Sequence, residues 1–353
     1  MFHVKFHYSW LPGQLPAKAG EAQLFGLLAG IHREGSLRAA CQHVGLSYRY
    51  AWGLLGRWSE HFGQPLVVME QGRGAYLTPL GKKLLWAQQR VQARLAPQIE
   101  ALSAELEREL ASVVEPDAAR LDIVASHDLA LTAVRDHLAR CGGPRLDVRF
   151  QGSSDCLAAL AAEQTEIAGF HIEIGKENVD VFRRYLKPKS MSLIRFVTRR
   201  QGLIVTAGNP KKIRGVNDLV RTQFINRQAG SGTRLAFDRL LATANIGRTK
   251  IAGYQHEEFT HLAVAATIAS GHAEAGMGIE AAARQYGLDF VPLFEESYFL
   301  ACRKSLLETA KMKQFLANLI KPSMKNALAK IPGYGMDALG SVVEVDSIFA
   351  GGT

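Results

Sequence analysis

The strongest constraint on the fold lies in residues 35–58, which contain two short segments of helical periodicity separated by a glycine. In the first segment Ser36 is a suitable N-cap, and apolar residues then recur on one helical face: Leu37, Ala40, Cys41 and Val44. Gly45 fits the turn that ends this segment, because glycine adopts a left-handed backbone at little cost. The pattern therefore predicts two helices joined by a tight turn.

The second helix is expected to begin after Ser47, and its inward positions form another apolar row: Ala51, Leu54, Leu55 and Trp58. In a helix-turn-helix, the N-terminal end of the second helix enters the major groove. We therefore predict that DNA is contacted by polar, cationic and aromatic side chains near the helix starts: Ser36, Ser47, Tyr48, Arg49 and Trp52. An ordinary helical hairpin is the alternative that this pattern alone leaves open.

The next residues favour the DNA-binding interpretation. Residues 66–69 and 71–81 indicate a strand, a glycine turn, a second strand and the start of a helix. Arg73 lies at the tip of the turn, where a wing reaches phosphate or the minor groove. Residues 1–98 also hold 11 Lys and Arg against 4 Asp and Glu, a surplus typical of a phosphate-binding surface.

Residues 35–85 resemble the winged helix-turn-helix of LysR-type regulators and, more closely, the N-terminal domain of ModE-type molybdate-responsive regulators. The shared elements are Ser-Leu-Arg-Ala-Ala at 36–40, Gly-Leu-Ser-Tyr-Arg at 45–49, Ala-Trp at 51–52, Gly-Arg-Gly-Ala at 72–75 and Leu-Thr-Pro-Leu-Gly at 77–81. The resemblance implies that the helix beginning at Ser47 reads bases. It also implies that the helix after Thr78 dimerises.

The composition is that of a globular protein with anionic partners. The 353 residues are 47% hydrophobic and 21% charged, with a formal net charge of +9. Four cysteines without paired spacing predict buried free thiols, which suit a reducing compartment. Residues 1–10 alternate like a strand and lack an apolar signal core, and no apolar run reaches membrane-spanning length. We therefore expect a cytoplasmic protein that does not enter the membrane.

Residues 81–110 predict one long helix with an apolar seam: Leu84, Leu85, Ala87, Val91, Leu95, Ile99, Leu102, Leu106 and Leu110. Pro97 is expected to interrupt and kink it. We interpret this segment as the linker of a homo-oligomer, a dimer or a tetramer, rather than as a helix packed only on its own domain. The organisation would then be a DNA-binding domain at 1–80, a linker helix at 81–115 and a ligand-binding domain at 119–353.

Beyond residue 118 strands alternate with helices. Strands are predicted at 121–125, 146–150, 166–172, 202–206, 223–226, 251–254, 275–279, 289–293 and 298–301, and helices at 128–140, 153–162, 231–244 and 258–270. This alternation predicts a mostly parallel sheet with helices on both faces. The fold class is thus α+β in the N-terminal domain and α/β in a C-terminal domain that resembles a two-lobed periplasmic-binding-protein type II domain.

Three loops place hydroxyls and backbone N–H groups at a helix start directly after a strand: 125–128, 152–155 and 226–234. Such starts attract anions, and Gly230 and Gly232 allow a ligand to approach the backbone closely. Each serine alone is explained as an N-cap, but three such loops at the carboxyl ends of strands favour a binding cleft. His127 either donates to an anion or orients its loop, and Arg227 and Arg234 contact either the ligand or a carboxylate.

A second resemblance covers most of 121–302. The runs at 226–234, 253–261, 273–279 and 288–293 are similar to molybdate-binding-type domains that occur fused to ModE-like helix-turn-helix domains. The resemblance implies that Ser126, Ser153 and the 231–233 loop hold oxyanion oxygens, with Tyr298 as a further candidate. The full set of predicted ligand-binding residues is Ser126, His127, Ser153, Ser154, Arg227, Gly230, Ser231, Gly232, Thr233 and Tyr298. The usual C-terminal domain of ModE is absent, so its ligand is not inherited.

These features favour a transcription factor, not an enzyme, that binds a double-stranded DNA operator. Its expected effector is molybdate or tungstate, bound as an oxyanion, with no cofactor and no protein-ligated metal. One alternative is a LysR-like regulator that senses an organic acid or a molybdenum-cofactor species. Another is an enzyme of molybdenum-cofactor metabolism, although the sequence lacks convincing paired carboxylates, a metal cluster and a phosphate-loop lysine. The nearest approach to a catalytic cluster (His256, Glu257, Glu258 and His261) is expected to be solvated or to cap a helix.

Overall fold

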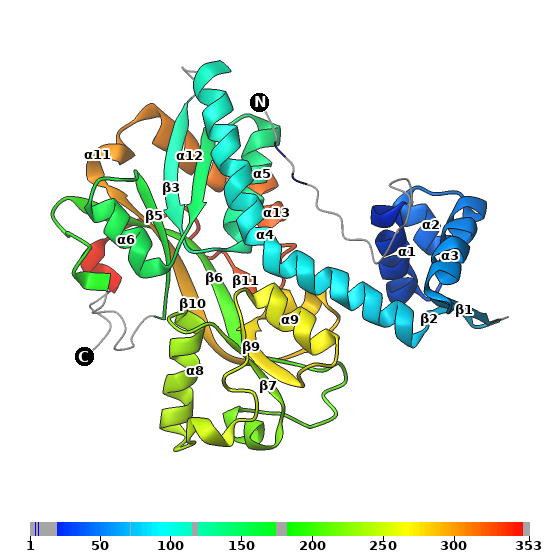
Figure 1. Ribbon diagram of the computed structural model, residues 1–353. Coiled ribbons are helices and arrows are strands. Elements are labelled where there is room, and N and C mark those ends of the chain that lie inside the picture. The colour runs from blue at the N-terminus through cyan, green and yellow to red at the C-terminus, as the bar shows by residue number, and fades with distance from the viewer. Residues whose placement is uncertain are drawn as a thin grey trace.

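The computed structural model of the protein describes residues 4, 6, 20–70, 72–114, 119–173 and 182–348. Figure 1 shows a small helical unit, a long helix that leads away from it, and a larger body built on a curled sheet. Residues 1–10, predicted to alternate like a strand, lie almost entirely outside the described residues.

The small unit contains α1 (Glu21–Glu34), α2 (Leu37–Val44), α3 (Tyr48–Phe62), β1 (Val67–Glu70) and β2 (Gly74–Leu77). The predicted caps are confirmed: Ser36 accepts a hydrogen bond from the Ala39 N–H, and Ser47 accepts one from the Tyr50 N–H. β1 and β2 pair antiparallel, as a wing requires. Gly74 lets this hairpin reach the α1–α2 turn, because a Cβ there would lie 2.2 Å from the Gly35 carbonyl oxygen. The unit thus has three helices followed by an antiparallel hairpin, the element order that was predicted for 35–81 with α1 added before it.

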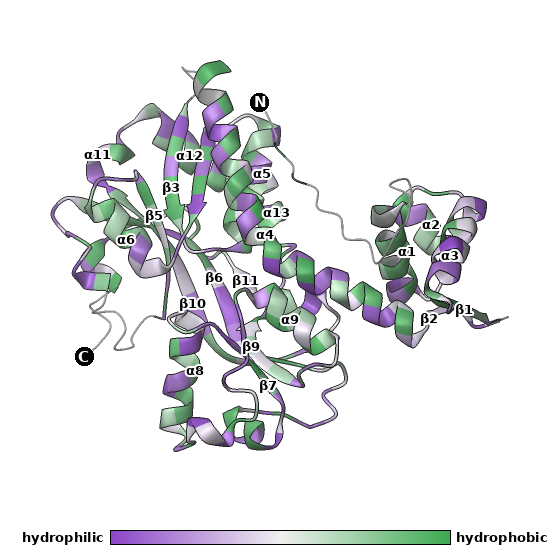
Figure 2. Cartoon of the chain, in the orientation of Figure 1, coloured by the Kyte–Doolittle hydropathy of each residue, from purple (hydrophilic) through white to green (hydrophobic). Residues whose placement is uncertain are grey.

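The long helix α4 (Pro79–Val114) spans 36 residues and is not interrupted at Pro97, contrary to the prediction. Figure 1 shows that it changes direction along its length, and Figure 2 shows hydrophobic and hydrophilic residues alternating along it. The predicted seam is divided between two surroundings. Leu85 and Ala93 are buried against α1–α3 and α9 of the same chain, whereas Leu102, Leu106 and Leu110 are exposed. The first part of α4 thus packs within the chain, and an apolar row stays uncovered farther along.

The larger body has two lobes. The first contains β3 (Arg120–Ala125), α5 (Leu129–Cys141), β4 (Arg145–Phe150), α6 (Ser153–Ala161), β5 (Ile167–Ile172), α11 (Lys304–Leu307), α12 (Ala310–Leu319) and α13 (Pro322–Leu328). The second contains η1 (Val216–Arg221), β7 (Phe224–Arg227), α8 (Gly232–Thr243), η2 (Arg248–Lys250), β8 (Glu257–Glu258), α9 (His261–Ala269), β9 (Ala275–Ile279) and α10 (Glu280–Gln285). Each lobe has buried apolar clusters on both faces of its sheet, so both faces are covered as predicted.

Two long strands join the lobes. β6 (Met191–Val205) and β10 (Asp289–Arg303) pair antiparallel along their whole length, and the short strands β11 (Tyr334–Gly335) and β12 (Val342–Glu344) add to β6, followed by η3 (Val345–Ile348). The sheet order is β4-β3-β5-β10-β6-β9-β7-β8. Gly202 is required at this crossing, because a Cβ there would lie 2.1 Å from the Val291 carbonyl oxygen. The sheet is continuous through both lobes.

Several predicted elements are corrected. The sheet is mixed, because β10 pairs antiparallel with both neighbours, and the strands predicted at 289–293 and 298–301 form this single strand. Residues 251–254 form turns instead of a strand, and Gly253 there has a φ of 86°. The helix predicted from 258 begins at His261, because residues 257–258 pair with β7 as β8.

Candidate anion site and DNA-binding surface

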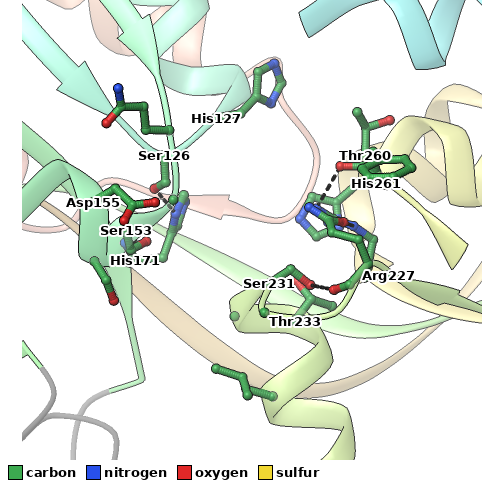
Figure 3. A pocket seen from close by; sticks show the side chains of 18 of the residues that line it. Ser126, His127, Ser153, Asp155, His171, Arg227, Ser231, Thr233, Thr260 and His261 are labelled. Carbon is green, nitrogen blue, oxygen red and sulfur yellow. Dashed lines mark hydrogen bonds between the residues drawn. The ribbon is translucent and has the colours of Figure 1, made fainter.

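A cavity of about 580 Å³ lies between the two lobes. Figure 3 shows Ser126, His127, Ser153, Asp155 and His171 on one side, facing a second group from the other lobe: Arg227, Ser231, Thr233, Thr260 and His261. The cavity lies beyond the ends of β3, β5 and β7, where an open α/β sheet binds its ligands.

Three helices of at least nine residues begin at this cavity: α6 after Gly152, α8 after Ser231 and α9 after Thr260. Backbone N–H groups in the first turn of a helix have no partner within the helix, and the helix dipole makes this end positive. The cavity is therefore lined by groups that favour negative charge. The convergence predicted for the three loops is observed, with the start of α9 as an addition.

Nine of the ten predicted ligand-binding residues line the cavity: Ser126, His127, Ser153, Ser154, Arg227, Gly230, Ser231, Gly232 and Thr233. Tyr298 does not. Its ring is 1% exposed, and its hydroxyl donates to the Ser126 carbonyl oxygen at 3.0 Å. Tyr298 thus supports the Ser126 loop from behind, because β10 carries it into the core of the first lobe.

The hydroxyls differ in what they offer a ligand. The Ser153 hydroxyl accepts a hydrogen bond from the backbone N–H of His171 at 3.4 Å, and the Thr233 hydroxyl accepts one from the side-chain amide of Gln201 at 3.2 Å. Each hydroxyl therefore retains its own proton for donation to a ligand. Ser231 instead accepts from the Arg234 N–H and donates to the Gln228 carbonyl oxygen at 3.0 Å. The Ser231 side chain is thereby occupied as a helix cap. At this loop a ligand would be bound by the backbone N–H groups at the start of α8 instead of by the Ser231 hydroxyl.

Arg227 is the cation with unused hydrogen-bonding capacity at the cavity. Its Nε donates to the Gln228 side chain and its Nη2 donates to the Phe259 carbonyl oxygen. Its Nη1 is buried and has no partner among the described residues. Burial and the nearby charge of Arg199 lower the pKa of Arg227 to about 10. A buried cation with a free donor fits an anion in the cavity.

Arg234 contacts a carboxylate, the second of the two roles that were predicted for it. Its Nη1 donates to the Arg227 carbonyl oxygen and to Glu257, each at 3.0 Å, and its guanidinium lies 4.1 Å from the centre of the Tyr254 ring. Arg234 therefore holds the loop that carries Arg227 and does not line the cavity.

Sequence reasoning missed a buried hub at Asp128 behind the cavity. This carboxylate accepts hydrogen bonds from His171 at 3.0 Å, Arg199 at 3.1 Å and Tyr334 at 3.0 Å, and it caps α5 through the Ala130 N–H. Burial alone would raise the pKa of Asp128, but the hydrogen bond from His171 and the charge of Arg199 lower it below its ordinary value. The partners lie far apart in sequence, so only the signal for the cap was visible.

His261 was predicted to be solvated or capping, and it instead lines the cavity. Its Nδ1 is buried without a partner among the described residues. Burial, together with the charges of Arg227 and Arg199, lowers the pKa of His261 well below its ordinary value. The imidazole is therefore neutral near neutral pH.

Glu258 was also expected to be solvated, and it is fully buried. Arg94 donates two hydrogen bonds to its carboxylate, at 2.7 and 2.8 Å, and Arg90 donates one at 3.3 Å. Both arginines belong to α4. The next residues along the chain, Phe259 and Thr260, line the cavity, and the Thr260 hydroxyl donates to the Ala93 carbonyl oxygen of α4 at 3.1 Å. The linker helix is thus attached to one wall of the cavity.

The predicted DNA-binding residues lie at the N-terminal ends of α2 and α3 and on the wing. Tyr48 and Trp52 are half exposed, and the exposed Arg49 side chain has no partner among the described residues. Arg73 on the wing has a side chain that is 79% exposed, with Glu70 at 3.6 Å. Ser36 and Ser47 act as helix caps beside them. The start of α3 and the wing therefore present cationic and aromatic groups to a partner.

In the part of the chain that the structure describes, no group of three or more His, Cys, Asp or Glu residues is arranged to hold a metal ion. No described helix combines the length and the apolar character that crossing a membrane requires.

The chain is 30% identical to the uncharacterized protein YvgK of Bacillus subtilis over 234 residues, which are 65% of this chain and 75% of YvgK. It is 35% identical to the molybdenum-pterin-binding protein MopB of Rhodobacter capsulatus over 26% of this chain and 36% of MopB. It is 25% identical to the molybdenum transport protein ModE of Azotobacter vinelandii over 43% of this chain and 58% of ModE.

Among solved structures, a mutant of OxyR from Corynebacterium glutamicum superposes with a TM-score of 0.45 at 15% identity, covering 87% of this chain and 92% of that one. The family model of the PBP superfamily domain matches residues 135–319, which include the second lobe, part of the first lobe and the strands β6 and β10 that join them. Since this match covers more than half of the sequence, the chain belongs to the PBP superfamily.

Proposed function

We propose that the protein is a DNA-binding transcriptional regulator whose two-lobed domain binds a small oxyanion, molybdate or tungstate, between the lobes. The observation that carries the proposal is the buried Nη1 of Arg227, which has no hydrogen-bond partner among the described residues, in a cavity where three helices begin. Ser153, Thr233 and free backbone N–H groups supply further donors. MopB and ModE, both named for molybdenum, support this choice of anion.

The contacts of α4 supply a route from the cavity to DNA. Glu100 of α4 lies 3.7 Å from His127 in the first lobe, and Arg90 and Arg94 bind Glu258 in the second lobe. One helix is therefore attached to both walls of the cleft. Closure of the lobes around an anion changes the distance between these attachments, and α4 carries the change to the helix-turn-helix unit.

Thermal unfolding and calorimetric titration with molybdate, tungstate and sulfate test this proposal. A ligand that binds only the folded state raises the melting temperature by mass action. We expect molybdate or tungstate to raise the melting temperature and to change the affinity for a duplex that the wild-type protein selects from a random-sequence library. Absence of both effects at millimolar anion would contradict the oxyanion assignment.

A larger organic anion, including a molybdenum-pterin species, is a second candidate. The cavity of about 580 Å³ is in the size range of sites for organic ligands and exceeds the volume of one tetrahedral anion. Phe182 and Phe259 line the cavity, and Phe259 is 67% exposed, which leaves its ring available to stack on the ring of an organic ligand. Titration of the wild-type protein and of Phe259→Ala with molybdate and with pterin-6-carboxylate separates the two candidates. The variant should lose affinity for the pterin, whose ring would contact Phe259, and should bind molybdate like wild type.

The DNA surface leads to a prediction for Arg49. Its exposed side chain at the start of α3 is positioned for a base contact. Arg49→Ala should weaken binding to the selected duplex by about 1–3 kcal/mol and leave binding to unrelated DNA much less affected. Arg73→Ala provides the contrast, because loss of a phosphate contact on the wing should weaken binding to all sequences and reduce the salt dependence. Wild-type mobility shifts for both variants would contradict the groove assignment.

The exposed row on α4 leads to a prediction about assembly. Leu102, Leu106 and Leu110 are 38–52% exposed, so covering the exposed part of each leucine in a dimer would contribute about 1 kcal/mol. The protein is expected to be a dimer at micromolar concentration by light scattering, and Leu106→Asp should shift it toward monomer. Val220→Asp, at an isolated exposed apolar position on η1, is the matched control. A monomeric wild-type protein, with and without DNA, would contradict this interface.

A further inference from the structure

The charged side chains around the cavity, unlike the helix starts, do not by themselves favour binding of a dianion. Arg199 and Arg227 line the cavity together with Asp155 and Glu296, and Arg199 also binds the buried Asp128. Arg199 is itself committed to carboxylates on two sides, Asp128 at 3.1 Å and Glu296 at 2.9 Å. Three carboxylates thus accompany two guanidinium groups, and a dianion would add two negative charges to a site that has no positive surplus.

Three histidines also line this cavity: His127, His171 and His261. His171 is the one whose protonation state is determined by its partners. Its Nε2 lies 3.0 Å from Asp128, and an ionised carboxylate only accepts hydrogen bonds, so Nε2 carries a hydrogen. In the neutral imidazole Nδ1 is then a bare acceptor, and the Ser126 hydroxyl, 2.7 Å away, donates to it.

When His171 is neutral, the proton of the Ser126 hydroxyl therefore points at the imidazole and away from an anion in the cavity. With its proton directed at Nδ1, Ser126 presents only lone pairs to the cavity, and these repel an oxyanion oxygen. Protonation of Nδ1 reverses this bond: the imidazolium donates to Ser126, and the Ser126 hydroxyl is released to donate to the ligand. One proton thus adds a positive charge and converts an acceptor into a donor.

We infer that an oxyanion enters the cavity together with one proton, which His171 takes up, and that this proton directs the Ser126 hydroxyl toward the anion. The inference rests on the proposed oxyanion function and adds a regulatory property to it. Occupancy of the site, and with it the response of the DNA-binding unit, depends on pH as well as on anion concentration.

The surroundings of His171 on every side agree with this assignment. Asp128 faces it from the start of α5, Arg199 from β6, Glu296 and the Tyr298 ring from β10, and Ser153 from α6. Tyr334 meets the same Asp128 oxygen, and Asp155, Arg227 and His261 also line the cavity. Burial and the Arg199 charge lower the pKa of His171, so the imidazole is neutral before an anion arrives.

The other two histidines have different surroundings. His261 faces Arg227 and Arg199 and has no carboxylate partner among the described residues, so protonation there is opposed. His127 lies 3.7 Å from Glu100 and makes no hydrogen bond with a described hydroxyl of the cavity. His171 alone joins a carboxylate on one side to a ligand-facing hydroxyl on the other.

Calorimetric titration of the full chain with molybdate, and with sulfate as a second dianion, tests the inference. Above neutral pH neither anion carries a proton, so any proton taken up belongs to the protein. Titrations in Mops and in Tris, which differ in ionisation enthalpy, should give heats whose dependence on the buffer corresponds to uptake of up to one proton. Because the bound anion raises the pKa of His171, affinity should fall as pH rises, by up to about tenfold per pH unit.

His171→Asn should bind molybdate without the buffer-dependent heat, because the amide does not titrate. His272→Asn makes the same change at an exposed histidine outside the cavity and should retain the wild-type uptake. Binding by wild type with no proton uptake would overturn the inference and leave the proposed function standing. Uptake that persists in His171→Asn but disappears in His261→Asn would also overturn it. If the wild-type protein binds no oxyanion, both the inference and the proposed function are contradicted.

The wild-type measurement stands on its own if His171→Asn fails to fold after Asp128 loses a partner. In that case Ser126→Ala gives the second variant, because it removes the hydroxyl and leaves the His171–Asp128 bond intact. Ser126→Ala should retain proton uptake and bind the anion more weakly by about tenfold, the loss of one donor to a charged group. Unchanged affinity in this variant would overturn the role assigned to Ser126.

Discussion

Arg227→Met should weaken molybdate binding by about a hundredfold, since one hydrogen bond to a charged group contributes about 1.5–3 kcal/mol. The same change should leave the empty protein at least as stable as wild type. The lowered pKa of Arg227 means that the folded protein disfavours its charge, and methionine fills similar space without a charge or a buried donor. Melting temperatures with and without molybdate measure both effects. The variant should melt no lower than wild type alone and should lose most of the anion-induced rise.

Arg221→Met is the matched control, because that arginine is 67% exposed and pairs with Asp218 on the surface. It should retain the wild-type response to molybdate. Arg227→Lys should recover part of the affinity, since lysine restores the charge but lacks the planar arrangement of donors. An anion-induced rise of wild-type size in Arg227→Met would contradict the placement of the anion at this guanidinium.

Glu258→Gln is expected to separate anion binding from the DNA response. The variant replaces the carboxylate that holds Arg90 and Arg94 of α4, while leaving the residues that line the cavity in place. Stability should fall by about 1–3 kcal/mol, because hydrogen bonds to charged donors are lost but both arginines, a third to a half exposed, can return to water. Molybdate should still raise the melting temperature. Its effect on affinity for the selected duplex should largely disappear.

Glu308→Gln removes one partner of an exposed ion pair with Lys313 and should leave both responses unchanged. The readouts are the anion-dependent melting temperature and the duplex affinity measured with and without molybdate. If Glu258→Gln keeps the full effect of molybdate on DNA affinity, α4 is not connected to the cavity through this carboxylate. The contacts of Glu100 with His127 and of Ala93 with Thr260 would then still connect α4 to the cleft.

Local periodicity was sufficient to predict α2, α3 and the wing of the N-terminal unit, but α1 was not predicted. The caps at Ser36 and Ser47, the turn at Gly45 and the buried row on α3 depend on neighbours within four residues, and each is observed. The same reasoning placed Ser126, Ser153 and Thr233 at strand ends, and the sheet brought them to one cavity. It failed at 251–254, where an apolar run resembles a strand but Gly253 adopts a positive φ and forms a turn.

The identity of the chemically important partners required the tertiary structure. Asp128 was visible as a residue at a helix start, but its partners His171, Arg199 and Tyr334 lie 43, 71 and 206 residues away. Glu258 looked solvated, because Arg90 and Arg94, more than 160 residues earlier, leave no trace in the surrounding sequence. Tyr298 was a candidate only through the resemblance to molybdate-binding-type domains, and the structure places its ring in the core of the first lobe.

The sequence by itself determined the helix caps, the amphipathic faces and the loops that can receive an anion, because these follow from hydrogen bonds and burial within a few residues. Only the tertiary structure decided which polar groups keep a free donor and which are already satisfied: Ser231 is occupied, whereas the Nη1 of Arg227 has no partner in the part of the chain that the structure describes. The physical reason is that the free energy of a buried charge depends on every group around it, and strands from both lobes supply those groups.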